Sequence, residues 1–228
     1  MKVTLLGAGA WGTAMAVQAA RFLEHDQVCL WSRSLEQIEH IQKQGENRTY
    51  LPGFTLPKSL RLEANFSEAI HRLGPHDLLV IATPMAGLAE TLVQVLQVAK
   101  HALNIVWLCK GLEPSSTFLP HQVVEREDRL HNKGIKHAYG VLSGPSFAKE
   151  VANGMPCALT VASQSDELCT IVQTAFHHGN MRIYASDDLI GVELGGAIKN
   201  VLAIVAGISD GLNPVSYTHL TLPTIYSV

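Results

Sequence analysis

The chain has 228 residues, a formal net charge of −3 and 47% hydrophobic residues. This length is enough for one large domain or two smaller ones with a sizeable buried core. The small negative charge gives no indication of nucleic acid or a membrane surface as a partner. No apolar run reaches the roughly 18 residues that a membrane-spanning helix needs, so we expect no membrane span.

The cysteines indicate the compartment. Cys29, Cys109, Cys157 and Cys169 share no C-x-x-C spacing, and three of them lie in predicted strands and one in a predicted helix. This usage is typical of reduced, buried thiols, so we expect a cytoplasmic protein. The 11 histidines are scattered along the chain, and we expect no metal site.

The opening residues predict a strand, a glycine-rich turn and a helix. Residues 2–6 are apolar and partly β-branched, and residues 13–22 are strong helix formers. Between them, Gly7 permits a tight turn, Gly9 admits a pyrophosphate to the backbone, and Gly12 lets helix and strand pack closely. The free N–H groups at the helix N-terminus favour phosphate, so this stretch predicts a dinucleotide-binding unit.

A secretory signal is the alternative interpretation of the same stretch. One lysine, an apolar run and Ala14-Met15-Ala16 resemble such a signal with its cleavage site. The glycines at positions 7, 9 and 12 would break the apolar helix that a signal needs. The residues therefore favour the dinucleotide-binding unit.

Arg33 follows the second predicted strand, residues 27–31. In NAD-preferring sites an Asp or Glu about 20 residues after the glycines binds the ribose 2′-hydroxyl. This position offers no carboxylate, and a guanidinium suits a 2′-phosphate. We therefore predict a preference for NADP(H) with NAD(H) use left open, the alternative being that Arg33 is simply solvated.

Strands and helices alternate along the next part of the chain. Residues 34–44 predict a helix with Ser34 as N-cap and Gln37 completing a capping box, followed by a loop at residues 47–57. Further strands are expected at 61–64, 77–83, 104–109, 139–142, 157–162 and 181–184. Further helices are expected from residue 67 and at 85–99, 118–129 and 166–176. This alternation predicts an α/β fold with one doubly wound, Rossmann-type sheet.

Two polar residues follow predicted strands at the edge where ligands bind. Lys110 comes directly after residues 104–109, where a phosphate or a carbonyl would lie. Ser146 follows the strand at 139–142 and can cap a helix or bind an anion. The alternatives are a solvated loop lysine and an ordinary capping serine.

A long helix at residues 188–208 is apolar on all faces, which predicts that it is buried. Glu193 and Lys199 must then be paired or face a cleft. A lysine in such a setting is usable as a proton donor or acceptor. Gly195 and Gly196, one turn earlier, let a ligand or another backbone approach. The alternative is a structural, buried pair of Lys199 with Glu193.

These features together resemble the bacterial NAD(P)-dependent glycerol-3-phosphate dehydrogenase family. The matching stretches are GAGAWGTA (7–14), WSR (31–33), YLP (50–52), CKGL (109–112), LSGPSFAKE (142–150) and ELGGAIKNV (193–201). Their order and spacing hold over residues 1–212. The resemblance implies interconversion of dihydroxyacetone phosphate and sn-glycerol 3-phosphate by hydride transfer with NAD(P)H, supplying glycerophospholipid synthesis.

The motif and the resemblance also imply residue roles. The expected cofactor-binding residues are Gly7, Gly9, Ala10, Trp11, Gly12, Arg33, Tyr50, Lys110 and Ala148. The expected substrate-binding residues are Lys110, Gly144, Ser146 and Lys199. Lys199 is implied as the catalytic acid/base, because a carbonyl that accepts a hydride becomes an alkoxide and needs a proton. Lys110 would neutralise phosphate or developing charge.

The resemblance stops near residue 212. We expect a dinucleotide-binding domain at residues 1–186 and the first helix of a helical substrate domain at 187–212. Residues 213–228 match nothing in the family and are predicted to be a non-native read-through tail. We therefore expect the chain to fold in part, to bind NADP(H) and to turn over slowly. The sequence leaves open whether the intact protein forms a homodimer.

Two other functions remain alternatives. One is a dinucleotide-binding regulatory module without catalysis, and the other is a reductase acting on a hydroxy acid or a sugar nucleotide. A pure binding module has no use for Lys199 as a second buried lysine after Lys110, which favours an enzyme. Dependence on a phosphate group in the substrate would separate the reductases.

Overall fold

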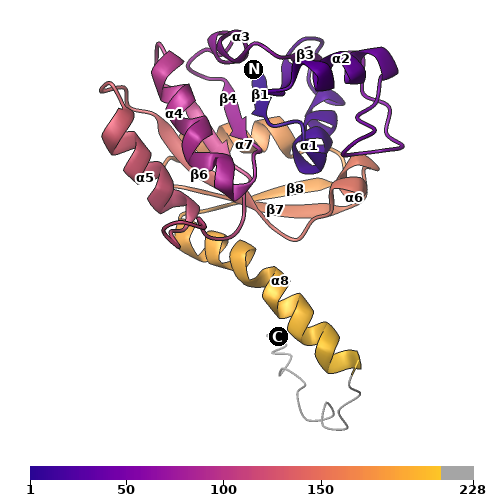
Figure 1. The fold of residues 1–228 in the computed structure, drawn as a ribbon, viewed down its shortest axis with the longest axis vertical. Coiled ribbons are helices and arrows are strands. Elements are labelled where there is room, and N and C mark those ends of the chain that lie inside the picture. The colour runs from indigo at the N-terminus through magenta and orange to yellow at the C-terminus, as the bar shows by residue number, and fades with distance from the viewer. Residues whose placement is uncertain (212–228) are drawn as a thin grey trace, which may run out of the picture.

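Eight strands form one sheet in the computed structural model, which describes residues 1–211 (Figure 1). The strands are β1 (Val3–Leu6), β2 (Val28–Trp31), β3 (Arg61–Glu63), β4 (Leu78–Ile81), β5 (Asn104–Trp107), β6 (Ala138–Ser143), β7 (Cys157–Ser163) and β8 (Met181–Ser186). The helices are α1 (Ala10–Ala20), α2 (Leu35–Gln44), α3 (Phe66–His71), the 3₁₀ turn η1 (Met85–Gly87), α4 (Leu88–Val98), α5 (Pro120–His131), α6 (Ala148–Ala152), α7 (Asp166–Phe176) and α8 (Leu189–Gly211). The predicted tail at 213–228 lies outside the described residues.

The strand order places β1 at the point where the chain changes direction across the sheet. The order is β3-β2-β1-β4-β5-β6-β7-β8, so the chain first moves from β1 to β3 and then crosses back to β4. The strands from β3 to β6 pair in parallel, so their carboxyl ends share one edge. β7 runs antiparallel to β6 and parallel to β8. Ligands of such sheets bind outside the carboxyl ends, at the change of direction.

Helices cover both faces of the sheet, as the predicted doubly wound fold requires. Side chains of β1 alternate between the two faces, because Val3 and Leu5 belong to one buried cluster and Leu6 to the other. The first cluster includes side chains of α1, α6 and α7, and the second includes side chains of α3, α4 and α5. The sequence-based prediction of the fold class is therefore confirmed.

The start of α2 differs in part from the predicted capping box. Ser34 Oγ accepts the backbone N–H of Gln37 at 3.1 Å, as predicted. The Gln37 side chain does not return to the N-cap; its Nε2 donates to the carbonyl oxygen of Ala8 at 2.9 Å. The backbone N–H of Ser34 instead donates to Ser32 Oγ at 3.2 Å. Gln37 Oε1, the atom that a complete capping box would use as acceptor, instead accepts the Ser32 hydroxyl at 2.6 Å.

Helix α8 runs away from the sheet rather than into the core (Figure 1). Its first residues are held, because Leu189 and Val192 pack against the second buried cluster. Further along, the described apolar side chains are 43% to 62% exposed, namely Leu194, Ile198, Val201, Leu202, Ile204, Val205 and Ile208. The prediction of a buried helix is therefore wrong for the apolar side chains from Leu194 to Ile208, because no other described element covers them.

Within residues 1–211, no single helix is long and apolar enough to cross a membrane. The two arms of α8, Leu189–Lys199 and Val201–Ser209, pass the length and composition test only as a pair bent by 43°.

Gly12→Ala tests the packing of α1 on β1. A Cβ at Gly12 would lie 2.0 Å from the backbone oxygen of Gly7, so we expect a loss of roughly 2 kcal/mol in the free energy of unfolding. Helix propensity alone would favour alanine by about 1 kcal/mol. A net loss in the free energy of unfolding therefore measures the clash with the backbone of Gly7. Urea unfolding followed by circular dichroism measures it.

The matched control is Gly9→Ala in the same turn. No atom lies within 4 Å of a Cβ placed at Gly9. The free energy of unfolding should therefore stay within about 0.5 kcal/mol of the parent chain. Equal effects of the two substitutions would contradict the packing argument.

Candidate functional site

The glycine-rich turn after β1 is tight on one side and open on the other. Gly7 has φ +124°, and a Cβ there would lie 2.9 Å from the backbone oxygen of Ala82 after β4. Gly9 is the N-cap of α1 and has open space where a Cβ would point. Ala10 follows as the first residue of α1. The N-terminus of the helix is therefore accessible to a phosphate group at the change of strand direction.

Two side chains that the sequence analysis did not identify hold this turn. Asn47 is 1% exposed, and its Nδ2 donates to the carbonyl oxygen of Ala8 at 2.9 Å and to Thr13 Oγ1 at 2.8 Å. Gln37 donates to the same oxygen of Ala8 at 2.9 Å. The local pattern places Asn47 in a loop and carries no signal for a contact with residues so distant along the chain. These amides fix the turn from outside.

Several buried polar atoms near the carboxyl edge have no partner among the described residues. They are Trp11 Nε1, Thr83 Oγ1, Ser143 Oγ and Ser146 Oγ. A buried polar atom without a hydrogen bond costs free energy, so each is available to a ligand. Trp11 and Ser146 were predicted as site residues; Thr83 and Ser143 were not.

Ser146 does not cap the helix that follows it. The N-cap of α6 is Phe147, and no side chain forms a cap hydrogen bond there. The capping alternative is therefore wrong, and the Ser146 hydroxyl remains unpartnered within the described part of the chain. Ala148 is the first residue of α6 and packs against the buried cluster that contains α1.

Lys110 and Gly144 meet at the ends of β5 and β6. The Lys110 ammonium donates to the carbonyl oxygen of Gly144 at 2.8 Å. Burial lowers the pKa of Lys110 to about 8, and the nearby charge of Lys199 lowers this pKa in the same direction. Lys110 is thus partly buried and bonded to the backbone of Gly144, which argues against an ordinary solvated lysine.

Lys199 lines a cavity of about 270 Å³ formed by β6, β7 and α8. Ser143, Gly144 and Thr160 line the same cavity. The Lys199 ammonium lies 5.8 Å from the centre of the Phe147 ring, within the range of a cation–π contact. The structure therefore brings the predicted acid/base beside a predicted substrate residue, Gly144.

Glu193 does not pair with Lys199. Its carboxylate accepts hydrogen bonds from Trp107 Nε1 at 2.8 Å and from the backbone N–H of His121 at 3.0 Å. Its second oxygen lies 2.5 Å from His121 Nδ1. The alternative of a structural Lys199–Glu193 pair is therefore wrong, because Trp107 and His121 are the partners of the carboxylate.

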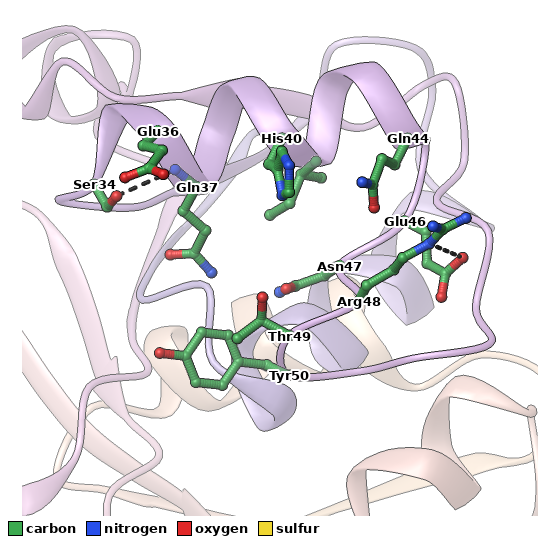
Figure 2. Close-up of a pocket in the computed structure, with 11 residues that line it drawn as sticks. Ser34, Glu36, Gln37, His40, Gln44, Glu46, Asn47, Arg48, Thr49 and Tyr50 are labelled. Atoms are coloured by element: carbon green, nitrogen blue, oxygen red, sulfur yellow. Dashed lines mark hydrogen bonds and ion pairs between the residues drawn. The ribbon is translucent and has the colours of Figure 1, made fainter.

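A second cavity of about 250 Å³ lies between α2 and residues 46–50 (Figure 2). Gln37, His40 and Gln44 line it from the helix, and Arg48 and Tyr50 line it from the loop. Tyr50 is 51% exposed. The exposed Arg33 directly precedes the N-cap of α2 but is not among the lining residues.

The predicted site residues thus form two groups along one edge of the sheet. The glycine-rich turn, Arg33 and Tyr50 lie around β1 and β2, and the two lysines with Gly144 lie around β5 and β6. Three strand spacings separate β1 from β6, which is about 14 Å. An extended dinucleotide suits such a separation.

These features define a dinucleotide-binding α/β protein of the Rossmann type. Its first six strands have the order 3-2-1-4-5-6, and the glycine-rich turn opens α1 at the change of direction. The model of the NAD-dependent glycerol-3-phosphate dehydrogenase N-terminus matches residues 2–169, and that of the C-terminus of the same enzyme matches residues 188–225. The chain belongs to the NAD-dependent glycerol-3-phosphate dehydrogenase family, which confirms the resemblance.

Individual relatives agree with this assignment. A protein of Polynucleobacter necessarius named glycerol-3-phosphate dehydrogenase (NAD(P)+) is 70% identical over 213 residues, which is 93% of this chain and 63% of that protein. A counterpart of Cupriavidus metallidurans with the same name is 52% identical. The crystal structure of glycerol-3-phosphate dehydrogenase from Coxiella burnetii superimposes with a TM-score of 0.80 at 35% identity, covering 92% of this chain and 61% of that one. The chain thus spans less than two thirds of these relatives.

The lowered pKa of Lys110 predicts a pH-dependent anion site. The ammonium is charged below about pH 8 and loses its charge as the pH rises through that value, so affinity for a phosphate group should fall over that range. Calorimetry with inorganic phosphate from about pH 7 to about pH 10 measures this dependence. Lys110→Met should bind weakly at every pH. An unchanged affinity across the range in the parent chain would contradict the assignment.

Proposed function

We propose that this chain binds NADP(H) and acts in the interconversion of dihydroxyacetone phosphate and sn-glycerol 3-phosphate, the reaction that supplies glycerophospholipid synthesis. The family assignment supports the reaction class. The observation that carries the proposal is the meeting of Lys110, Gly144 and Lys199 beside one cavity at the carboxyl edge. Two amines at one point suit a substrate with a phosphate group and a carbonyl that becomes an alkoxide.

The residues around the glycine-rich turn fit a dinucleotide. The open face of Gly9 leaves room for a pyrophosphate at the N-terminus of α1. Trp11 Nε1 is buried without a partner within residues 1–211 and is available as a donor. Gly7 and Gly12 admit no side chain and keep the turn against β4 and β1. When bound, the nicotinamide supplies the hydride chemistry.

The chain's own residues then perform the remaining steps of the proposal. Lys199 gives its proton to the oxygen of the former carbonyl and takes it back in the reverse reaction. Lys110 balances negative charge on the substrate, and its bond to Gly144 holds its amine next to a residue that lines the cavity. The unpartnered hydroxyl of Ser146 accepts or donates a hydrogen bond to the substrate.

Arg33 supports a preference for NADP(H). The relatives' names say NAD(P)+ and specify no preference. Arg33 is exposed beside the start of α2, where the ribose of a dinucleotide on this fold lies, and no carboxylate takes its place. Tyr50 borders the neighbouring cavity and supplies a ring face to the same end of the cofactor.

A cytoplasmic location is part of the proposal. The four cysteines are free thiols, and three of them are buried. Burial raises the pKa of Cys29 to about 11 and that of Cys109 to about 12, so both stay protonated and unreactive. Such thiols suit a reducing compartment.

Arg33→Ala tests the cofactor preference. Loss of one charge-assisted contact to a 2′-phosphate should weaken NADPH binding by roughly tenfold and leave NADH binding within about twofold. Isothermal titration calorimetry with both nucleotides measures this difference. Lys43→Ala removes an exposed cation near the end of α2 and serves as the matched control. Equal losses for both nucleotides would contradict a 2′-phosphate contact.

A catalytic test uses the 228-residue chain with NADPH and dihydroxyacetone phosphate. Oxidation of NADPH, followed by its absorbance, should be slow in this chain and should vanish in Lys199→Met, while NADPH binding by calorimetry stays within about twofold. Undiminished turnover in Lys199→Met would contradict its role as acid/base. A chain that binds neither nucleotide would contradict the proposed function as a whole.

A further inference from the structure

The Glu193 carboxylate joins three elements at one buried point. Its side chain is 1% exposed. It accepts the indole N–H of Trp107 on β5, and it contacts both the backbone N–H and the ring of His121 on α5. Glu193 itself lies on α8. Each of these hydrogen bonds joins residues at least 72 positions apart in the sequence, so the bonds fix the relative positions of separate elements.

Two of the joined elements position the site lysines, because Lys110 follows β5 and Lys199 lies on α8. Trp107 is the last residue of β5, and Lys110 follows it by three positions. Lys199 follows Glu193 by six positions on α8. The far part of α8 is exposed, so among the described residues the helix is held chiefly by its first turns. The direction of α8, and with it the place of Lys199, thus depends on few contacts.

Helix α8 also covers Lys110. A Cβ built at Gly196 would lie 3.5 Å from Lys110 Cγ and 3.7 Å from Lys110 Cδ, and 2.8 Å from Ser143 Oγ. The backbone of α8 therefore rests on the lysine stem without an intervening side chain. A small rotation of the helix would uncover Lys110 and move Lys199 away from it.

We propose that Glu193 is a positioning residue, which holds Lys199 beside Lys110 by tying α8 to β5 and α5. The inference rests on the proposed function for what the two amines do to a substrate. Two observations support the positioning role of Glu193: the three contacts of its carboxylate, and the close approach of Gly196 to Lys110. Glu193 touches no reacting atom and acts through the two lysines.

The pKa of Lys110 reports the position of α8. Burial and the charge of Lys199 both lower this pKa to about 8, from an ordinary value of 10.5. Withdrawal of α8 removes part of both causes, so the pKa of Lys110 should rise. Direct loss of a nearby negative charge has the opposite sign, because it would lower the pKa of a lysine. The direction of the shift therefore separates positioning from a simple charge effect.

The experiment compares Glu193→Leu with Glu193→Gln in the nucleotide-free chain. Leucine fills similar volume without accepting a hydrogen bond, whereas glutamine still offers an oxygen to Trp107 and to the backbone N–H of His121. Nuclear magnetic resonance of ¹³Cε-labelled lysines, titrated with pH, measures the pKa of Lys110. We expect a rise of about one unit or more in the leucine variant and a value near the parent's in the glutamine variant.

Two controls calibrate this shift. Lys199→Gln removes the neighbouring charge and shows how far the pKa of Lys110 rises from that cause alone. Glu127→Leu removes another buried carboxylate on α5, which pairs with Arg126 and His131 rather than with α8. We expect Glu127→Leu to leave the pKa of Lys110 unchanged.

A milder variant keeps the test decisive if Glu193→Leu fails to fold. His121→Leu retains the backbone N–H to Glu193 and removes only the ring contact, on a side chain that is 16% exposed. We expect a smaller rise in the pKa of Lys110 there. An unchanged pKa in folded Glu193→Leu, or in folded His121→Leu where the former does not fold, overturns the proposal. A fall in the pKa overturns it as well.

This outcome is independent of nucleotide binding. The pKa of Lys110 is measured without nucleotide, and calorimetry with NADPH on the parent chain tests the proposed function separately. Absent nucleotide binding in the parent chain would contradict the proposed function and leave the positioning result intact.

Discussion

The close packing of α1 on β1 is the constraint on which the site depends. A Cβ at Gly12 would lie 2.0 Å from the backbone of Gly7, and one at Gly7 would lie 2.9 Å from the backbone of Ala82. Only glycine allows strand, turn and helix to approach this closely. The approach directs the N-terminus of α1 to the point where the strand order changes direction, which makes that point suitable for a phosphate group.

The other half of the site combines charge with burial. Lys110 follows β5, and Lys199 arrives from α8, far along the chain. Two ammonium groups near one another are unfavourable, which is one reason why the pKa of Lys110 is lowered. The buried bonds of Glu193 hold the helix that brings them together. A negatively charged group between the two amines would relieve this repulsion.

Local sequence patterns predicted the positions of helices and strands better than they predicted how these elements pair and pack. The helix predicted at 166–176 coincides with α7, because Ser165 caps it and its apolar spacing is regular. The helix predicted at 118–129 begins instead at Pro120, because proline suits the first helical position and Leu119 stays extended. No local pattern indicates that β7 runs antiparallel to β6, since strand direction depends on pairing between distant segments.

The sequence by itself determined the strand–turn–helix unit, the α/β class and the identity of the candidate lysines, because glycine spacing and apolar periodicity act over a few residues. Only the tertiary structure decided which partners they have. In the folded chain, Asn47 bonds to the glycine-rich turn, and Glu193 accepts hydrogen bonds from Trp107 and His121. The apolar side chains of α8 beyond Glu193 are largely exposed. These outcomes depend on groups that are distant in sequence and meet only when the sheet assembles, so no local pattern encodes them.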